Sequence, residues 1–234
     1  MHLILRSAAA TDRGPVRPNN EDSAFAGRRL AVVADGIGGL PDGEQASGIA
    51  IEVLAPLETA ETSDPAGALA RAVENANILI EARGQDMGTT VTAVLLAGYR
   101  LGLLHVGDSR AYLLAAGASG VVRLTRDDTF VQQLVDTGAL TAEQARGHPR
   151  RSLITQAVKG EPYRASVATV PVEAGDRVLL CSDGLSDYVD DHAIGEVLRT
   201  EPDPAACAGR LVALALAVPT NDNVTAVIAD VVAE

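Results

Sequence analysis

The sequence predicts an α+β fold built in layers, with helices gathered in two blocks around runs of short strands. Helical periodicity is strongest in two stretches, at about 43–85 and 190–218, and strand-like apolar runs joined by short turns fill much of the remainder. The chain has 234 residues, of which 47% are hydrophobic and only 3% aromatic. We therefore expect one domain, or at most two, with a core of Val, Leu, Ile and Ala.

The first half of the chain begins with strands and then turns helical. A loop or twisted edge strand at 11–21, broken by Pro15 and Pro18, separates the first two strands. Further on, four consecutive apolar runs punctuated by glycine predict an antiparallel meander. The expected strands lie at 2–9, 30–34, 89–97, 100–106, 111–115 and 121–124, and the expected helices at 43–60 and 65–85.

The second half contains the least regular part of the chain, the polar segment 137–162, which we expect to be an excursion at the surface. Around it the apolar periodicity again alternates between helix and strand. The expected helices lie at 129–136, 190–200 and 203–218, with a further short one starting at 141, and the expected strands at 165–170, 177–182 and 224–232.

Charge and cysteine content limit the setting in which the protein works. A net charge of −12 argues against binding to nucleic acid or to an anionic membrane, because both would repel it. No apolar run approaches the length of a membrane span, and residues 2–9 are typical of a first strand rather than a signal peptide. We expect Cys181 and Cys207 to be small buried hydrophobic side chains, and hence a reducing, cytoplasmic setting. We also expect a monomer.

Acidic residues recur at the ends of the expected strands. Asp35 follows the run 30–34 and is followed in turn by glycines at 36, 38 and 39, and Asp183 ends the run at 177–182 in the same way. Asp222 precedes the last strand, and further acids stand at 21–22 and 108. A single Asp-Gly after a strand is usually a plain turn, but the recurrence indicates a shared site.

Converging carboxylates would need a cation. Two carboxylates about 5 Å apart repel by roughly 3 kcal/mol at an effective dielectric constant near 20. Their pKa values would rise unless a cation lay between them, and a site built from oxygen ligands alone suits Mg²⁺ or Mn²⁺.

Other phosphate chemistries do not match the sequence. A cysteine phosphatase needs Arg six positions after its Cys, but Asp187 and Ala213 stand there. A P-loop needs Ser or Thr after its Lys, and Lys159 is followed by Gly. Pro41 occupies the place of the third Gly of a dinucleotide fingerprint. The four histidines are scattered, unlike those of a zinc hydrolase, and lie at 2, 105, 148 and 192.

Seven short motifs follow one another along nearly the whole chain. They are Arg17-x-x-Asn20-Glu21-Asp22, Ala34-Asp35-Gly36-Ile37-Gly38-Gly39, Gly43-Glu44-x-Ala46-Ser47, Gly88-Thr89-Thr90, Gly107-Asp108-Ser109-Arg110-Ala111-Tyr112, Ser182-Asp183-Gly184-Leu185 and Asp222-Asn223-Val224-Thr225. Each motif is weak alone, but together in this order they resemble the metal-dependent protein phosphatase family, type 2C. The bacterial branch of serine/threonine phosphatases is the most similar.

The resemblance implies an architecture and a site. The fold would be a four-layer α-β-β-α sandwich of two antiparallel sheets flanked by helices, forming one catalytic domain over 1–234. The excursion at about 137–162 would correspond to the family's flap beside the active site. The metal centre would lie at one end of the sandwich, between the sheets.

The resemblance also implies a reaction, the hydrolysis of phosphoserine and phosphothreonine monoesters by a water that bridges two Mn²⁺ or Mg²⁺ ions. Arg17 would bind the phosphoryl oxygens, and Asp22 would orient ligated water. Asp108 and Asp187 would hold a third, weaker ion. The ligands of the two tight ions would be Glu21, Asp35, the carbonyl of Gly36, Asp183 and Asp222.

The sequence departs from the family pattern at three positions. Ile37 replaces a histidine that some members carry as a proposed proton donor to the leaving alcohol. Leu40 stands where bacterial relatives often have His, and Asp128 follows Asp127 where His is common. None of these changes removes an expected metal ligand.

Two other functions compete with this hypothesis. A degenerate phosphatase would bind phosphoproteins without hydrolysing them, although here every expected carboxylate is present. A structural calcium site would use the same acids, but no EF-hand-like loop exists. For an active enzyme the expected partners are phosphorylated proteins, a serine/threonine kinase or its substrates.

Overall fold

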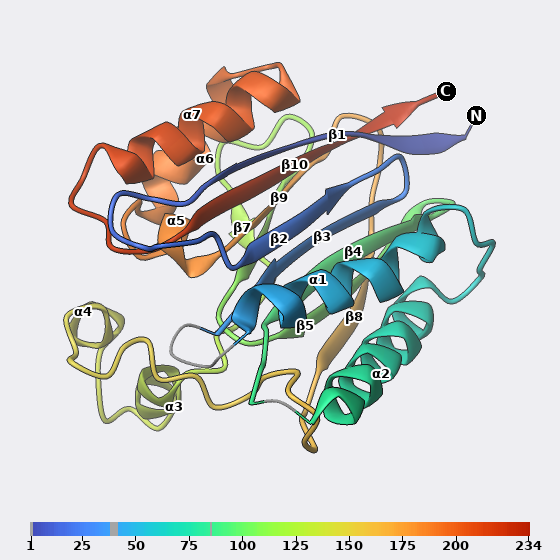
Figure 1. Cartoon of the computed structure of the whole chain (residues 1–234). Coiled ribbons are helices and arrows are strands. Elements are labelled where there is room, and N and C mark those ends of the chain that lie inside the picture. The colour runs from blue at the N-terminus through green and yellow to red at the C-terminus, as the bar shows by residue number, and fades with distance from the viewer. Residues whose placement is uncertain (1, 38–41, 85) are drawn as a thin grey trace.

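Figure 1 shows a computed structural model of the chain, which describes residues 2–37, 42–84 and 86–234. Two antiparallel sheets pack face to face, and helices cover the outer face of each. The predicted four-layer α-β-β-α sandwich is therefore confirmed. The motif residues Gly38 and Gly39, together with Leu40 and Pro41, lie outside the described residues.

Each sheet contains five of the described strands. The first sheet has the order β1-β10-β9-β6-β7 and the second β2-β3-β4-β5-β8, with every neighbouring pair antiparallel. The strands are β1 (Leu3–Asp12), β2 (Asp22–Ala26), β3 (Leu30–Asp35), β4 (Val91–Ala97), β5 (Arg100–Val106), β6 (Arg110–Leu114), β7 (Val122–Arg123), β8 (Ser166–Pro171), β9 (Arg177–Cys181) and β10 (Val224–Ala233).

The helices divide between the two outer faces and one end of the sandwich. In Figure 1, α1 and α2 cover the second sheet and α6 and α7 cover the first, while α3 and α4 lie beside one end. None of the described helices combines the length and the apolar character needed to cross a membrane. The helices are α1 (Gly43–Leu54), η1 (Ala55–Glu58), α2 (Pro65–Arg83), α3 (Phe130–Asp136), α4 (Ala142–Arg146), α5 (Asp183–Ser186), α6 (Asp191–Thr200) and α7 (Pro204–Leu216).

Three layers of apolar side chains hold the sandwich together. One layer lies between the sheets, and the other two lie between each sheet and its helices. Central strands are therefore covered on both faces, which explains why residues 30–34 of β3 are all apolar and fully buried. Both cysteines are buried and unpaired, as the sequence predicts.

The predicted antiparallel meander is wrong at its middle connection: β4 pairs with β5 and β6 with β7, but β5 and β6 lie in different sheets. β5 pairs with β4 and β8, whereas β6 pairs with β7 and β9 of the other sheet. The chain crosses between the sheets at Gly107, where φ is 108° and an added Cβ would lie 2.6 Å from the Cγ2 of Thr90. A local apolar pattern cannot distinguish the two pairings, because both bury the same side chains. The crossing places Asp108 between the sheets.

Two short elements are not predicted from the sequence. β2 has five residues, four of them only partly buried, and α5 is a single turn directly after β9. Neither is long enough to show a period. Both carry acids of the candidate site at their first residue, Asp22 and Asp183.

One edge of each sheet is short or ends at a proline, whereas β1, the other edge of the first sheet, has ten residues. β7 has two residues and β8 ends at Pro171, which lacks the N–H needed to pair with a further strand.

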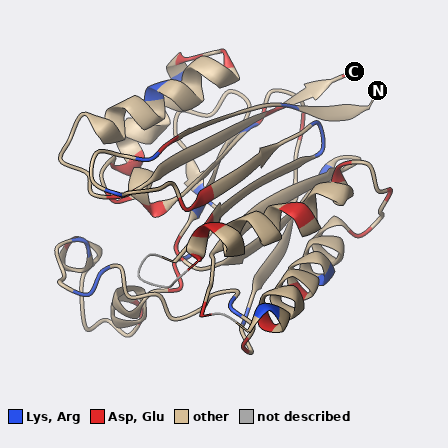
Figure 2. Ribbon diagram, viewed as in Figure 1, with Lys and Arg blue, Asp and Glu red and all other residues tan. Residues whose placement is uncertain are grey.

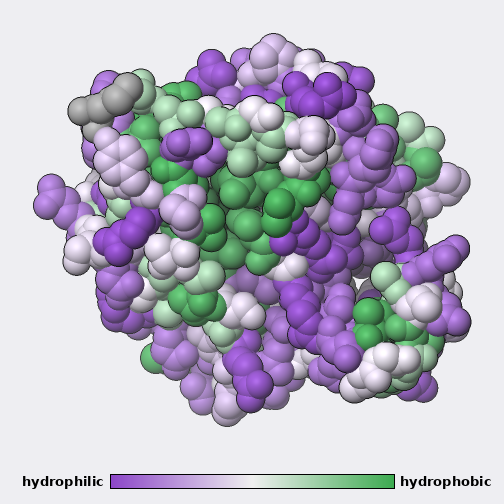
Figure 3. Space-filling model, turned by 180° about the vertical axis from the view of Figure 1, so that it is seen from behind, coloured by the Kyte–Doolittle hydropathy of each residue, from purple (hydrophilic) through white to green (hydrophobic). Residues whose placement is uncertain are grey.

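Seen from behind, apolar side chains gather in the middle of the face (Figure 3). Val122 on β7 and Val167 on β8 are 60% and 46% exposed.

The close approach of α2 to its sheet is tested by Gly102→Ala. A Cβ on Gly102 of β5 would lie 2.6 Å from the backbone nitrogen of Ala66, so helix and sheet would have to separate. We expect a loss of about 1–3 kcal/mol in the free energy of unfolding, measured by urea denaturation. The control is Gly209→Ala on α7, where nothing lies within 4 Å and the better helix propensity should stabilise by about 0.5–1 kcal/mol. Equal stability of the wild type and Gly102→Ala would contradict this packing.

Candidate metal centre

Acids from both sheets meet at one end of the sandwich (Figure 2). Asp35 is the last residue of β3 and lies opposite Asp22 of β2 in the register of the second sheet. Asp183 begins α5 two positions after the last residue of β9 in the first sheet, and Asp222 stands two positions before the first residue of β10. The strands therefore bring together carboxylates as far apart in the sequence as Asp22 and Asp222.

The backbone around Asp35 is held by the segment that precedes β4. The carbonyl of Asp35 accepts from the backbone N–H of Thr90 at 2.8 Å, and the N–H of Asp35 donates to the Thr90 hydroxyl at 3.1 Å. Gly36 follows, and an added Cβ there would lie 2.5 Å from the carbonyl oxygen of Gly43. Only glycine fits at this position, where its N–H donates to the carbonyl of Glu21 at 3.1 Å.

Asn223 ties the N-terminal loop to the last strand. Its side-chain carbonyl accepts from the N–H of Glu21 at 2.9 Å, and its amide donates to the carbonyls of Arg13 and Asn19 at 2.8 and 3.0 Å. The Asp222 carboxylate in turn accepts from the N–H of Asn223 at 2.9 Å. The sequence predicts only that Asn223 positions the Asp222 turn, whereas the side chain also fixes Glu21.

Asp22 lies behind Asp35 and is buried. The hydroxyl of Ser182 donates to one of its carboxylate oxygens at 2.8 Å, and the other oxygen, Oδ1, is buried without a partner in the described part of the chain. Burial raises the pKa of Asp22 to about 6 despite the hydrogen bonds from Thr225 and Ser182. An unpaired buried carboxylate oxygen fits an acceptor for a water or an ion.

The central carboxylates carry uncompensated negative charge. The pKa of Asp35 is raised well above its usual range, first by burial and then by the charges of Asp22 and Asp183. The pKa of Asp183 is raised in the same way, first by burial and then by Asp108 and Asp222. A bound divalent cation would reverse these shifts, so the set of oxygen donors fits Mg²⁺ or Mn²⁺.

Arg17 is the cation that faces this cluster from the N-terminal loop. Its Nη2 lies 2.9 Å from the Asp222 carboxylate, and its Nε donates to the carbonyl of Asn221 at 3.1 Å. Burial alone would lower the pKa of the Arg17 guanidinium. The negative charge of Asp222 and its hydrogen bond to Arg17 act in the opposite direction, and the pKa is raised. The side chain is about one third exposed, so it reaches the cluster from the solvent side.

Asp108 and Asp187 form a second acidic pair beside the first group. Burial raises the pKa of Asp108 to about 7, with further contributions from the charges of Asp127 and Asp187. The pKa of Asp187 is also raised, mainly by burial, although Arg151 lies 3.4 Å from its carboxylate. Arg151 belongs to the excursion at 137–162, which therefore contacts this pair directly.

A cavity of about 110 Å³, the metal-centre cavity, collects most of the predicted residues. Glu21 and Asp22 are not among its lining residues, and Asp187 lines a neighbouring cavity. As the side chains lie, no three acidic, His or Cys residues in the described ranges surround one point closely enough to coordinate an ion. The sequence did not predict the two lining residues of the excursion. The lining is Arg17, Asp35, Gly36, Ile37, Asp108, Ser152, Ile154, Asp183 and Asp222.

Comparison with known proteins decides the family. The sequence profile of protein phosphatase 2C matches residues 18–207, which is most of the chain. The chain belongs to the protein phosphatase 2C family. This membership agrees with the resemblance seen in the seven motifs and with the arrangement of two sheets flanked by helices.

Bacterial members of the family are similar to almost the whole chain. The serine/threonine protein phosphatase PstP of Mycobacterium tuberculosis is 50% identical over 98% of this chain, which spans only 46% of that relative. The chain thus spans about half the length of the first curated relatives that it matches. The serine/threonine phosphatase Stp of Listeria monocytogenes is 32% identical, with 98% of this chain and 96% of the relative covered.

Solved structures of the PstP catalytic region have the same fold. A crystal structure of PstP superposes with a TM-score of 0.93 at 49% identity, covering 98% of this chain and all of the other. A second structure, of the PstP catalytic domain in complex with two manganese ions, gives a TM-score of 0.91 at 48% identity, covering 99% of this chain and 100% of that one.

The acid cluster predicts how stability depends on pH in the presence of chelator. Because the pKa values of Asp22, Asp35, Asp108 and Asp183 are raised on folding, the folded state binds more protons than the unfolded state above about pH 4. The free energy of unfolding should therefore fall as the pH rises from 5 to 8. Each group contributes up to about 1.4 kcal/mol per pH unit between its unfolded and folded pKa.

Urea denaturation across this pH range measures the effect. Asp108→Asn should reduce the slope, whereas Asp86→Asn, at an exposed position outside the site, should not. Excess Mn²⁺ should restore stability at pH 8. A chelated protein that is more stable at pH 8 than at pH 5.5 would contradict the buried, uncompensated charge.

Proposed function

We propose that the protein is a metal-dependent serine/threonine protein phosphatase that hydrolyses phosphoserine and phosphothreonine monoesters. The observation that carries the proposal is the meeting of Asp35, Asp183 and Asp222, from both sheets, in one cavity that Arg17 also lines. Support comes from the family and from a relative, 48% identical over 99% of this chain, whose catalytic domain binds two manganese ions.

Two Mn²⁺ or Mg²⁺ ions would be held by the carboxylates of Asp35, Asp183 and Asp222 and by the carbonyl of Gly36, with Glu21 contributing partly through water. When bound, such ions supply a deprotonated water as nucleophile and neutralise charge on the phosphoryl group. The hydrogen bonds of Asn223 to the Glu21 segment and of Thr90 to Asp35 keep these ligands in place.

Arg17 would bind the phosphoryl group, because a guanidinium can donate to two phosphoryl oxygens at once. Its present partner is the Asp222 carboxylate, which a metal ion would take over as a ligand. Arg17 would then be free to face the substrate. Asp22, held by Ser182 and with one oxygen unpaired, would orient a water beside the metal centre.

Asp108 and Asp187 would hold a third ion more loosely, since they provide fewer protein ligands. The side chain of Ile37 lines the metal-centre cavity and has no proton to give to a leaving alcohol. The proton would therefore come from water in this region rather than from a histidine.

We further propose that residues 1–234 act as one catalytic domain with a flap at about 137–162, and that the protein works as a monomer in the cytoplasm. The short β7 and the proline that ends β8 limit pairing between copies at these two edges, which supports the monomer, and the unpaired cysteines support a reducing setting. A role in bacterial signalling, opposite a serine/threonine kinase, follows from the proposed reaction. The alternative is a phosphoprotein-binding pseudophosphatase. Loss of an expected metal ligand would favour it, but every one of these ligands is present in the sequence.

Activity should depend strictly on divalent metal and on the central carboxylates. Phosphate release from a phosphothreonine peptide should be seen with Mn²⁺ or Mg²⁺ and be abolished by excess chelator. Asp35→Asn, Asp183→Asn and Asp222→Asn should each lose turnover while remaining folded by circular dichroism. Full activity in chelator, or in Asp35→Asn, would rule out the mechanism, and a metal-loaded wild type that binds the peptide without turnover would support the pseudophosphatase.

Arg17→Ala should weaken both substrate binding and the chemical step. Loss of a bidentate contact with a charged phosphoryl group should cost on the order of 2–3 kcal/mol in kcat/KM. Arg17→Lys should recover only part of this loss, because an ammonium lacks the planar fork. Steady-state kinetics on small phosphomonoesters measures the effect. Unchanged kinetics in Arg17→Ala would show that Arg17 is a surface residue without a role in phosphate binding.

A further inference from the structure

A second cavity, of about 240 Å³, lies directly beside the metal centre. Asp108 and Asp183 line both cavities, so the two are neighbours. On its other sides the second cavity is lined by β6, by α5 and by residues of α3 and α4 in and around the excursion. We call it the arginine cavity, after Arg110, Arg123 and Arg146, three of the four arginines that line it.

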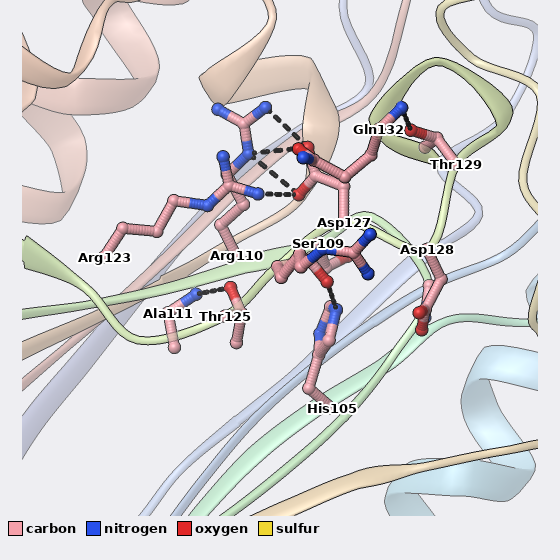
Figure 4. Close-up of polar contacts among 12 residues, drawn as sticks. His105, Ser109, Arg110, Ala111, Arg123, Thr125, Asp127, Asp128, Thr129 and Gln132 are labelled. Carbon is pink, nitrogen blue, oxygen red and sulfur yellow. Dashed lines mark hydrogen bonds and ion pairs between the residues drawn. The ribbon is translucent and has the colours of Figure 1, made fainter. Parts of the chain in front are cut away.

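Two of these arginines share one carboxylate. Arg110 donates through Nη2 and Nε to the two oxygens of Asp127 at 2.8 and 3.1 Å, and Arg123 pairs with the same carboxylate. Figure 4 shows both guanidinium groups pointing toward Asp127. The side chains of Arg110 and Asp127 are only 13% and 11% exposed, so this charge is poorly screened. The cluster carries an excess of one positive charge.

Arg146, the last residue of α4, adds a further positive charge. It lines the arginine cavity, is exposed, and its side chain has no partner among the described residues. The opposing acid is Asp191, 3.9 Å from Arg110 and 45% exposed. Over the whole lining, four arginines stand against five aspartates. Three of these aspartates, Asp108, Asp183 and Asp187, are proposed metal ligands, so bound ions would leave the cavity with an excess of positive charge.

Two buried donors in this lining have no acceptor. The hydroxyl of Ser186 and the Nε of Arg123 are both buried and unpartnered in the described part of the chain. Ser186 is only 4% exposed and lines the cavity from α5. Buried polar atoms are nearly always paired, so two unpaired donors in one lining indicate that an acceptor binds there.

We propose that the arginine cavity is a substrate subsite for a second anionic side chain, either phosphorylated or carboxylic, close in sequence to the phosphoresidue that is hydrolysed. The proposal rests on the proposed phosphatase function and specifies the substrate class. Excess positive charge and unpaired donors favour an anion over an apolar or basic side chain. An extended peptide advances about 3.4 Å per residue, so a side chain one to three positions away reaches a cavity that shares a wall with the metal centre.

The test compares phosphothreonine peptides that differ at one position. Glu, phosphothreonine or Gln is placed at each of the three positions on either side of the target, and kcat and KM are measured with saturating Mn²⁺. At one or more positions the anionic peptide should be preferred over the Gln peptide about fivefold in kcat/KM, mainly through KM. The Glu and phosphothreonine arms distinguish a carboxylate from a phosphoryl group as the occupant.

Variants then assign the preference to the cavity. Arg146→Ala and Arg123→Gln should bring the ratio close to one, and Arg146→Glu should favour a Lys peptide. Arg210→Ala, on α7 across the molecule, removes the same charge and should keep the wild-type ratio. Thermal melting checks that each variant is folded.

No anionic preference at any position, or the same preference in wild type, Arg146→Ala and Arg123→Gln, would overturn the subsite. Turnover of the Gln peptide would still support the proposed function in that case. Absence of metal-dependent turnover of every peptide by the wild type would instead overturn the proposed function itself.

Discussion

Repulsion among buried carboxylates is the constraint on which this structure depends. Burial raises the pKa values of Asp22, Asp35, Asp108 and Asp183, and the negative charges of neighbouring aspartates raise them further. If these acids stood on a flexible loop, they would move apart into water, because the separation would cost little free energy. Here three apolar layers fix the strands from which the acids project. Burial of apolar surface thus maintains an arrangement that is electrostatically unfavourable without a cation.

The connections between the sheets determine which acids meet. The crossing at Gly107 carries the chain from β5 to β6 and places Asp108 between the layers. Asn223 joins the N-terminal loop to β10, and Ser182 joins the end of β9 to Asp22. These polar contacts run between the two sheets and fix their relative position where the metal ions would bind. Arg151 extends the same system to the excursion through Asp187.

Much of this was predictable because strand periodicity and the seven motifs are local signals. The layered fold, most strand positions and the set of acids followed from them. The expected pairing of β5 with β6 was wrong because the apolar face of a strand does not specify which neighbour the strand pairs with. β2 and α5 were missed because five residues and one turn show no period. Ser152 and Ile154 were missed because they reach the metal-centre cavity only through the path of the excursion, which no local pattern specifies.

Folding holds several carboxylates of this protein together with fewer negative charges than they would carry in water. Metal binding should then expel protons. Calorimetric titration with Mn²⁺ at pH 6.5, in buffers with different ionisation enthalpies, counts the ions and the protons released together. We expect two tightly bound ions and the release of at least one proton, with fewer protons released as the pH rises. Tight binding without proton release at pH 6.5, or no tight binding at all, would contradict it.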